Sequence, residues 1–186
     1  MAGNREVEIK FKIDGIEDLA AGLGAAGFRA VTERTHEMNT LYDLPGNPLR
    51  RRGALLRIRK YGSKWSVTYK DKSKVKPGRH KSRTEIETQV QDGQALAEIL
   101  RAAGFLPGFA YEKFRSEWAD GTGHVVIDET PIGNFGEIEG PPQWIDDVAG
   151  RLGISRKQYI TASYAELFLL WKRRTGSKVT QMVFAL

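Results

Sequence analysis

Apolar and polar residues alternate along many short stretches of this chain. In the first stretch, Arg5–Ile13, apolar residues occupy every second position from Val7 onward, and charged residues lie between them. A period of two is typical of a β-strand that buries one of its faces. The same pattern, interrupted by turn residues, recurs and predicts about eight strands. The expected strands are Arg5–Ile13, Ala30–Tyr42, Ala54–Tyr61, Lys64–Lys70, Ser82–Val90, Ala110–Trp118, His124–Asp128 and Asn134–Glu139.

Helices are expected between and after these strands. Asp14 can cap the first helix, which Gly27 ends, and Gly104 ends the second. The expected helices are approximately Ile16–Ala26, Gly93–Ala103, Pro142–Leu152 and Ala162–Lys172. Because most strands follow one another directly and do not alternate with helices, the pattern predicts an α+β fold. Its sheet is mostly antiparallel, and the helices pack outside it.

Two segments show neither pattern. Asp71–Lys81 is polar, basic and interrupted by Pro77 and Gly78, so it is expected to be a mobile loop. Residues 175–186 have no clear period and are expected to be loosely held. The 186 residues are enough for one domain, which is expected to span residues 1–174.

The composition is that of an ordinary soluble protein, because 40% of the residues are hydrophobic. No apolar run approaches the ~20 residues that a membrane span requires, and the amino terminus lacks the apolar core of a signal peptide. The absence of cysteine excludes disulfides, thiolate zinc sites and a cysteine nucleophile. We therefore expect a cytoplasmic protein without a membrane partner.

The net charge of +6 and the isoelectric point near 9.5 favour an anionic partner. An excess of Lys and Arg also serves simply to keep a protein in solution. Composition therefore leaves both nucleic acid and small phosphate compounds open, and the distribution of the charges has to decide between them.

Charged residues two positions apart share one face of a strand, about 6.6–6.8 Å from each other. Acids and bases both form such pairs. The pairs are Glu6 and Glu8, Glu85 and Glu87, Glu137 and Glu139, Arg57 and Arg59, and Lys113 and Arg115. On any single strand this is most simply a solvated face, as in many antiparallel sheets. Taken together, however, the acid pairs would repel one another unless cations lay between them, and hard divalent cations prefer oxygen ligands.

A sheet that packs its apolar face under helices and curls would turn the charged face into the lining of a tunnel. Arg side chains bind phosphate oxygens through two parallel hydrogen bonds, and Lys adds compact positive charge. Carboxylates hold a metal ion that bridges phosphates. Such a lining has the chemistry of a polyphosphate site.

The segment Glu6-Val7-Glu8-Ile9-Lys10 and several later segments match, in order, the motifs of a known family. The later segments are Leu41–Asp43, Leu56–Arg59, Trp65–Lys70, Arg83–Glu87, Tyr111–Arg115, Val126–Asp128, Gly136–Gly140 and Ser163–Leu167. The chain resembles the CYTH, or triphosphate tunnel metalloenzyme, superfamily, whose ExExK signature is the first of these segments. The matches span about Arg5–Leu170, which is nearly the whole chain.

The resemblance implies an eight-stranded antiparallel β-barrel that forms a tunnel, dependence on Mg²⁺ or Mn²⁺, and a substrate that carries a triphosphate. It also implies roles for the charged residues. Those on the metal side are Glu6, Glu8, Asp128, Glu137 and Glu139. Those that hold the triphosphate are Lys10, Arg57, Arg59, Lys70, Arg83, Lys113 and Arg115. The residues expected to be catalytic are Glu6, Glu8 and Lys10.

Three further residues have roles that the resemblance leaves open. Glu85 and Glu87 join either the metal side or a scaffold of salt bridges. Tyr164, at a motif position on the last helix, either reaches one end of the tunnel or packs in the core.

Members of the superfamily include thiamine triphosphatases, inorganic triphosphatases, RNA triphosphatases and class IV adenylyl cyclases. Cyclases of the bacterial type carry a His-Phe pair shortly ahead of the ExExK glutamates, whereas here only Met1–Arg5 precede Glu6. We therefore expect metal-dependent hydrolysis of a triphosphate, with inorganic triphosphate, ATP or thiamine triphosphate as candidate substrates. The alternative is a cyclase that converts ATP to cyclic AMP and pyrophosphate.

A third hypothesis, non-catalytic binding of polyphosphate or nucleic acid, is less favoured. Recognition of a duplex needs an exposed basic stripe. Most of the bases in this chain share their strands with same-face acids, which repel a nucleic-acid backbone. The sequence leaves the oligomeric state open, with a homodimer as one option.

Overall fold

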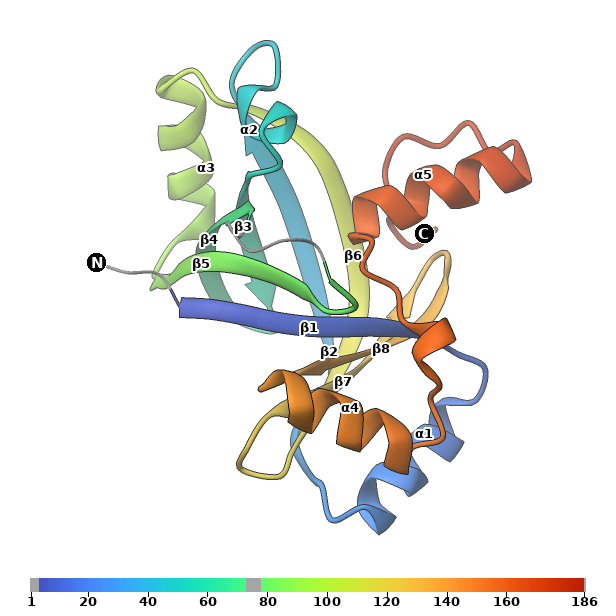
Figure 1. The fold of residues 1–186 in the computed structure, drawn as a ribbon. Coiled ribbons are helices and arrows are strands. Elements are labelled where there is room, and N and C mark those ends of the chain that lie inside the picture. Colours follow the sequence, from blue (N-terminus) through green and yellow to red (C-terminus); the bar gives the residue numbers. More distant parts are fainter. Residues whose placement is uncertain (1–3, 73–77, 186) are drawn as a thin grey trace.

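Eight antiparallel strands close into a barrel within residues 4–72 and 78–185, the part of the chain that the computed structural model describes (Figure 1). The strands are β1 (Asn4–Ile13), β2 (Arg29–Asp43), β3 (Leu55–Tyr61), β4 (Lys64–Lys72), β5 (Lys81–Val90), β6 (Leu106–Ala119), β7 (His124–Thr130) and β8 (Gly133–Glu139). Their order around the barrel is β1-β5-β4-β3-β2-β6-β7-β8, and β8 pairs with β1 to close it. The predicted fold class is confirmed.

Most strands extend a few residues beyond the ranges that the sequence predicts. β4 continues through Asp71 and Lys72, at the start of the predicted loop, because these residues pair with β5. β6 begins at Leu106 and not at Ala110, because its first residues pair with the end of β2. β5 begins at Lys81, which the sequence assigns to a loop, because Lys81 pairs with Glu8 of β1. Residues 73–77 of that predicted loop lie outside the described residues.

Helices lie outside the barrel, as the sequence predicts (Figure 1). They are α1 (Ile16–Ala25), α2 (Pro48–Arg51), α3 (Gly93–Ala102), α4 (Pro142–Arg151) and α5 (Tyr164–Thr175), with a short 3₁₀ helix over Arg156–Gln158. The sequence does not predict α2, a single turn held by Asp43, which accepts hydrogen bonds from the backbone N–H groups of Leu49 and Arg50. No helix in the described ranges is long and apolar enough to cross a membrane.

The main apolar core lies between the outer face of the barrel and two helices. Ile9, Phe11 and Ile13 of β1 point outward and pack in one cluster with Leu23 of α1 and Ile145 of α4. Figure 1 shows α1 and α4 together on this side of the barrel. Burial of apolar surface stabilises the fold by roughly 25 cal/mol per Å². Because side chains alternate along a strand, this burial turns the charged face of β1 toward the interior.

A second cluster packs at one end of the barrel. Tyr111 of β6 and Phe135 of β8 lie there against Tyr164 and Phe168 of α5. Met182 belongs to the tail that the sequence expects to be loosely held. Its side chain is buried in this cluster, and its backbone pairs with β6. The lining of the barrel thus changes from charged to aromatic toward α5.

Candidate active site

Charged side chains from opposite walls of the barrel meet in its interior. Because β1 and β2 lie half-way around the barrel from each other, the wall formed by β8, β1 and β5 faces the wall formed by β3, β2 and β6. We call the first the acidic wall, because it carries the inward residues Glu6, Glu8, Glu85, Glu87, Glu137 and Glu139. We call the second the basic wall, because it carries the inward residues Arg57, Arg59, Lys113 and Arg115.

Asp128 of β7 lies beside the basic wall and is fully buried. It accepts hydrogen bonds from Lys113 Nζ at 3.0 Å and from Arg115 Nε at 2.7 Å. The hydroxyl of Tyr164 donates a third at 2.6 Å. Burial and the charge of Asp128 raise the pKa of Tyr164 well above its ordinary value, so the phenol keeps the proton that it donates. Tyr164 therefore fills both of the roles considered for it: its ring packs in the apolar cluster, and its hydroxyl reaches the charged interior of the barrel.

Glu137 joins the two walls. Arg115 Nη2 donates to its carboxylate at 2.6 Å, and Lys10 forms a close ion pair with it. Burial raises the pKa of Glu137, but the charges of Lys10 and Arg115 outweigh it and hold the pKa well below its ordinary value. The carboxylate is therefore ionised and already paired with two cations.

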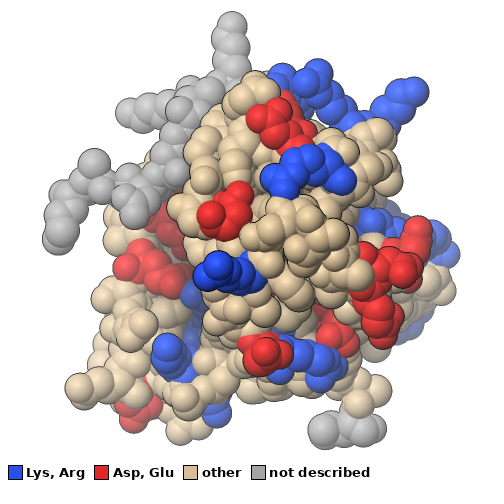
Figure 2. Space-filling view, turned by 90° about the horizontal axis from the view of Figure 1, so that it is seen from below, with Lys and Arg blue, Asp and Glu red and all other residues tan. Residues whose placement is uncertain are grey.

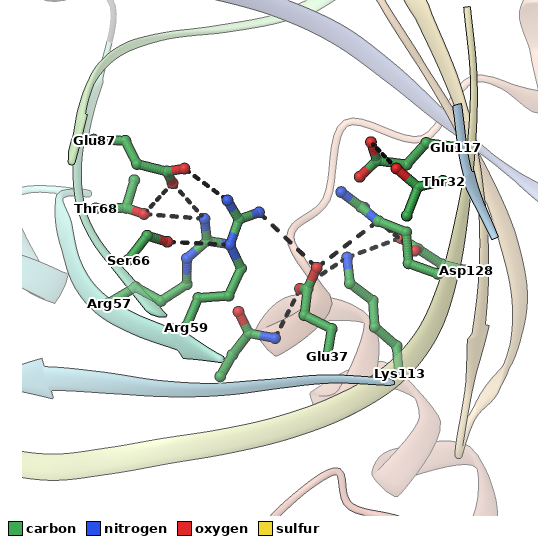
Figure 3. A network of polar contacts seen from close by, with 12 residues as sticks. Thr32, Glu37, Arg57, Arg59, Ser66, Thr68, Glu87, Lys113, Glu117 and Asp128 are labelled. Atoms are coloured by element: carbon green, nitrogen blue, oxygen red, sulfur yellow. Dashed lines mark hydrogen bonds and ion pairs between the residues drawn. The ribbon is translucent and has the colours of Figure 1, made fainter. Parts of the chain in front are cut away.

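Glu37 of β2 is a central interior residue that the sequence analysis does not identify. It is fully buried, and its carboxylate lies 3.3 Å from Lys113 Nζ, 3.9 Å from Arg59 Nη1 and 4.0 Å from Arg115 Nε. Figure 3 shows Glu37 between Arg59 and Lys113. Burial raises its pKa, but Lys113 and Arg115 outweigh that effect and lower it to about 2. The sequence gives no sign that Glu37 points inward, because apolar and polar residues do not alternate along β2. Both faces of this strand are polar, and its outward residue Met38 is exposed.

Arg57 and Arg59 of β3 share the carboxylate of Glu87. Arg59 Nη2 donates to it at 2.6 Å and Arg57 Nη2 at 3.4 Å, while the hydroxyl of Thr68 donates at 2.5 Å (Figure 3). Of the two roles open to Glu87, this geometry is that of a salt-bridge scaffold. The two guanidinium groups are thereby held close together on the basic wall.

Two lysines pair with the acids of the acidic wall. Lys70 Nζ lies 2.7 Å from Glu6 and 3.0 Å from Glu85. Lys81 Nζ donates to Glu8 Oε1 at 2.5 Å. Burial raises the pKa of Glu8, but the charge of Lys81 contributes most to lowering it to about 2. Lys81 is a second interior residue that sequence reasoning missed, because it lies at the edge of a segment that reads as a loop.

Glu139 differs from its neighbours, since its carboxylate has no hydrogen bond or ion pair among the residues that the structure describes. Partial burial within the barrel and the negative charges of the nearby Glu6 and Glu8 raise the pKa of Glu139 to about 7. Like charges are thus crowded on this wall, and a divalent cation would relieve the crowding. The carboxylate oxygens of Glu6, Glu8 and Glu139 are also the ligand type that Mg²⁺ and Mn²⁺ prefer. This donor set fits the expected metal.

The expected metal ligands do not form a coordination cluster in the structure. Within the described parts of the chain, no three carboxylate or imidazole groups converge on one point as metal ligands. Asp128 and Glu137 belong to the ion pairs of the basic side, whereas Glu6 and Glu8 belong to those of the acidic wall.

Arg83 is the expected phosphate ligand with the least internal pairing. It lies directly opposite Glu6 in the pairing of β1 and β5, which places its side chain on the inward face. Its guanidinium makes no hydrogen bond or ion pair with other residues in the described ranges. It is therefore available to an anion without breaking an internal contact.

Comparison with known proteins places these features in a family. The model of the CYTH domain matches residues 4–164. The adenylate cyclase CyaB of Aeromonas hydrophila is 27% identical over 176 residues, which cover 89% of this chain and 89% of that protein.

Solved structures share the fold. The PH1012 protein of Pyrococcus horikoshii is 25% identical, with a TM-score of 0.73 and coverage of 87% of this chain and 98% of that one. A Hippeastrum protein described as a putative adenylyl cyclase with a dominant triphosphatase activity has a TM-score of 0.62 at 20% identity. The match covers 94% of this chain and 97% of that one. The family match spans all eight barrel strands and reaches the start of α5, and on this evidence the chain belongs to the CYTH domain family.

Proposed function

We propose that this protein hydrolyses a triphosphate, either inorganic or organic, with the help of Mg²⁺ or Mn²⁺. The observation that carries the proposal is the opposition of an acidic wall and a basic wall inside one closed barrel. A metal–triphosphate complex has the matching distribution of charge, because its cation and its phosphate oxygens carry opposite signs.

The basic wall supplies the groups that bind phosphate. The guanidinium groups of Arg57, Arg59 and Arg115 can each donate two parallel hydrogen bonds to phosphate oxygens, and Lys113 adds a point charge. In the structure these groups are paired with interior carboxylates, so they are already fixed in position. A phosphate chain entering the barrel would replace part of these contacts, which avoids much of the ordering cost of binding.

The acidic wall would hold the metal through Glu6, Glu8 and Glu139. When bound, the ion would supply charge stabilisation for the phosphates and lower the pKa of a water molecule. Lys10 also lies in this wall, on β1, and is fully buried against Glu137. In this proposal its ammonium neutralises charge that develops on the leaving phosphate oxygens.

A second candidate function is the conversion of ATP to cyclic AMP and pyrophosphate. It is favoured by the name of the Aeromonas hydrophila relative, an adenylate cyclase. Cyclisation also requires the ribose to be held with its 3′-oxygen within about 3–3.5 Å of the α-phosphate. Met1–Arg5 contain neither the His nor the Phe of the pair expected in bacterial cyclases, and hydrolysis remains our first proposal.

Binding of nucleic acid without catalysis is less well supported. The outer face in Figure 2 carries acidic and basic residues interspersed, and it shows no continuous basic stripe. The paired charges of the barrel interior also suit a compact ligand with a bound cation better than a duplex.

Product analysis tests the proposal directly. The purified protein is incubated with Mg²⁺ or Mn²⁺ and with inorganic triphosphate, ATP or thiamine triphosphate, and released phosphate is compared with cyclic AMP. We expect phosphate release to exceed cyclic AMP formation and to stop when EDTA is added. Glu6→Gln should lower turnover about 100-fold or more. Glu129→Gln, which alters an outward residue paired with Arg34, should leave it unchanged. If ATP yields mostly cyclic AMP and pyrophosphate, the protein is a cyclase and the proposed hydrolysis is wrong. If none of the substrates yields a product, the protein is a non-catalytic binding protein.

A further inference from the structure

Lys81 forms an ion pair with one carboxylate of the acidic wall. It begins β5 directly opposite Glu8 of β1, so both side chains lie on the inward face. The Lys81 ammonium donates to Glu8 Oε1 at 2.5 Å, and the side chains of Lys81 and Glu8 are only 19% and 11% exposed. The ammonium therefore neutralises a carboxylate that we expect to hold the metal.

The neighbouring acids are arranged in the same way. Lys70 Nζ lies within 3.0 Å of both Glu6 and Glu85. Glu6 and Glu85 thus share the ammonium of Lys70, whereas Glu8 pairs with Lys81, and no three metal-ligating groups in the described residues converge on one point. A divalent cation that approaches Glu8 must therefore share its carboxylate with Lys81 or displace the ammonium.

We propose that Lys81 competes with the divalent cation for Glu8 and moves to the phosphate chain when metal and triphosphate enter together. The inference rests on the proposed function of the site. Repulsion between an ammonium and a divalent cation at one carboxylate is only weakly screened in partly buried surroundings. The metal ion alone therefore binds the free protein weakly.

The phosphate chain provides the released ammonium with a new partner. Lys81 lies two residues before Arg83, on the same inward face of β5. Arg83 has no ion pair with another described residue, so a phosphate that it binds would lie within reach of the flexible Lys81 side chain. Metal binding thus releases a cation that the phosphate chain takes up. Each ligand then favours the binding of the other by the same factor.

Calorimetric titration of the free protein with Mn²⁺ alone tests the competition. Lys81→Met should bind Mn²⁺ about tenfold more tightly than the wild type. Lys81→Arg, which keeps the charge, should bind like the wild type. Lys12→Met is the matched control, because it removes the same charge from a side chain on β1 that is 67% exposed. Its Mn²⁺ affinity should stay within about threefold of the wild type.

Lys81→Gln provides a second neutral variant, and circular dichroism confirms that each variant is folded. If the wild type and a folded neutral variant bind Mn²⁺ with equal affinity, Lys81 does not compete with the metal ion. The same conclusion follows if neither protein binds Mn²⁺ measurably. Phosphate release from inorganic triphosphate, ATP and thiamine triphosphate, measured on the same wild-type preparation, separates the two ideas. Metal-dependent release combined with unchanged Mn²⁺ affinity rejects only the role of Lys81, whereas a lack of metal-dependent release rejects the proposed function.

Discussion

At the scale of single residues, Glu37 illustrates how one buried carboxylate can order several cations. Three cationic groups lie within 4.0 Å of it, and Asn39 Nδ2 donates to it at 2.9 Å. Without Glu37, the cations of the basic wall would repel one another across the interior. Its pKa of about 2 keeps it ionised at neutral pH.

Glu37→Gln should destabilise the protein by about 3 kcal/mol, because it removes one charge from a buried network and leaves its partners in place. This loss lies at the low end of the roughly 3–5 kcal/mol that breaking a buried ion pair costs, since Lys113 and Arg115 keep Asp128 as a partner. Urea unfolding followed by tryptophan fluorescence measures the change. Glu129→Gln, whose partner Arg34 is half-exposed, should cost less than about 1 kcal/mol. Equal losses in the two variants would contradict a central role for Glu37.

Glu139 predicts a dependence of stability on pH. Its pKa is about 7 in the folded protein, above the value of 4.5 expected for an unpaired Glu. Between these values the folded state binds a proton that the unfolded state has lost, so this residue makes stability fall as pH rises. Relative to the wild type, Glu139→Gln should therefore gain stability above pH 7 and gain little below pH 4.5. Partial exposure of the side chain reduces the size of the effect.

Unfolding in urea at pH 5 and pH 8, with EDTA present, checks the sign. Replacement of EDTA by Mn²⁺ at pH 8, at a concentration high enough to fill this weak site, should remove much of the advantage of Glu139→Gln, because a bound cation relieves the same crowding of carboxylates. A stability difference that is the same at both pH values would show that Glu139 does not titrate in this window.

At the scale of elements, the contact between β1 and β8 requires a glycine. A Cβ added to Gly136 would lie 2.1 Å from the ring of Phe11, which is 3% exposed and belongs to the core under α1 and α4. The absence of a side chain at this position leaves room for the Phe11 ring against the backbone of β8, opposite Gly136 in the pairing of β1 and β8.

Gly136→Ala should destabilise the protein by about 1–3 kcal/mol, because a rigid core ring has to move. Gly24→Ala is the matched control: Gly24 is exposed in α1, and an added Cβ would meet no atom within 4 Å. It should raise stability by about 0.5–1 kcal/mol through helix propensity. Thermal unfolding of both variants measures the difference, and a neutral Gly136→Ala would show that Phe11 has room to shift.

At the scale of the whole molecule, closure of the barrel places charges where they can interact. In an open sheet each charged face would contact water, and the pairs between strands would contribute little. Closure sets the acidic wall opposite the basic wall and excludes much of the solvent. The pair between Lys10 and Glu137, separated by 127 positions in the sequence, forms only because β8 returns to β1.

The sequence by itself determined which face of most strands is charged. A period of two requires no knowledge of neighbouring strands, because it follows from the geometry of a single extended chain. For this reason Glu6, Arg59 and Lys113 could be assigned to one lining before any strand was paired. Their order along the chain also identified the family.

Only the tertiary structure decided which acid meets which base. These partners depend on strand register and on barrel closure, which involve residues far apart in the sequence. Glu37 was missed because both faces of β2 are polar, and Lys81 because the residues before it carry turn signals. The pairing of Lys81 with Glu8 exists because β5 continues to that residue along β1. The local alternation of residues thus determined which charged side chains line the barrel. The pairing of distant strands determined which of these charges already have a partner and which remain for a ligand.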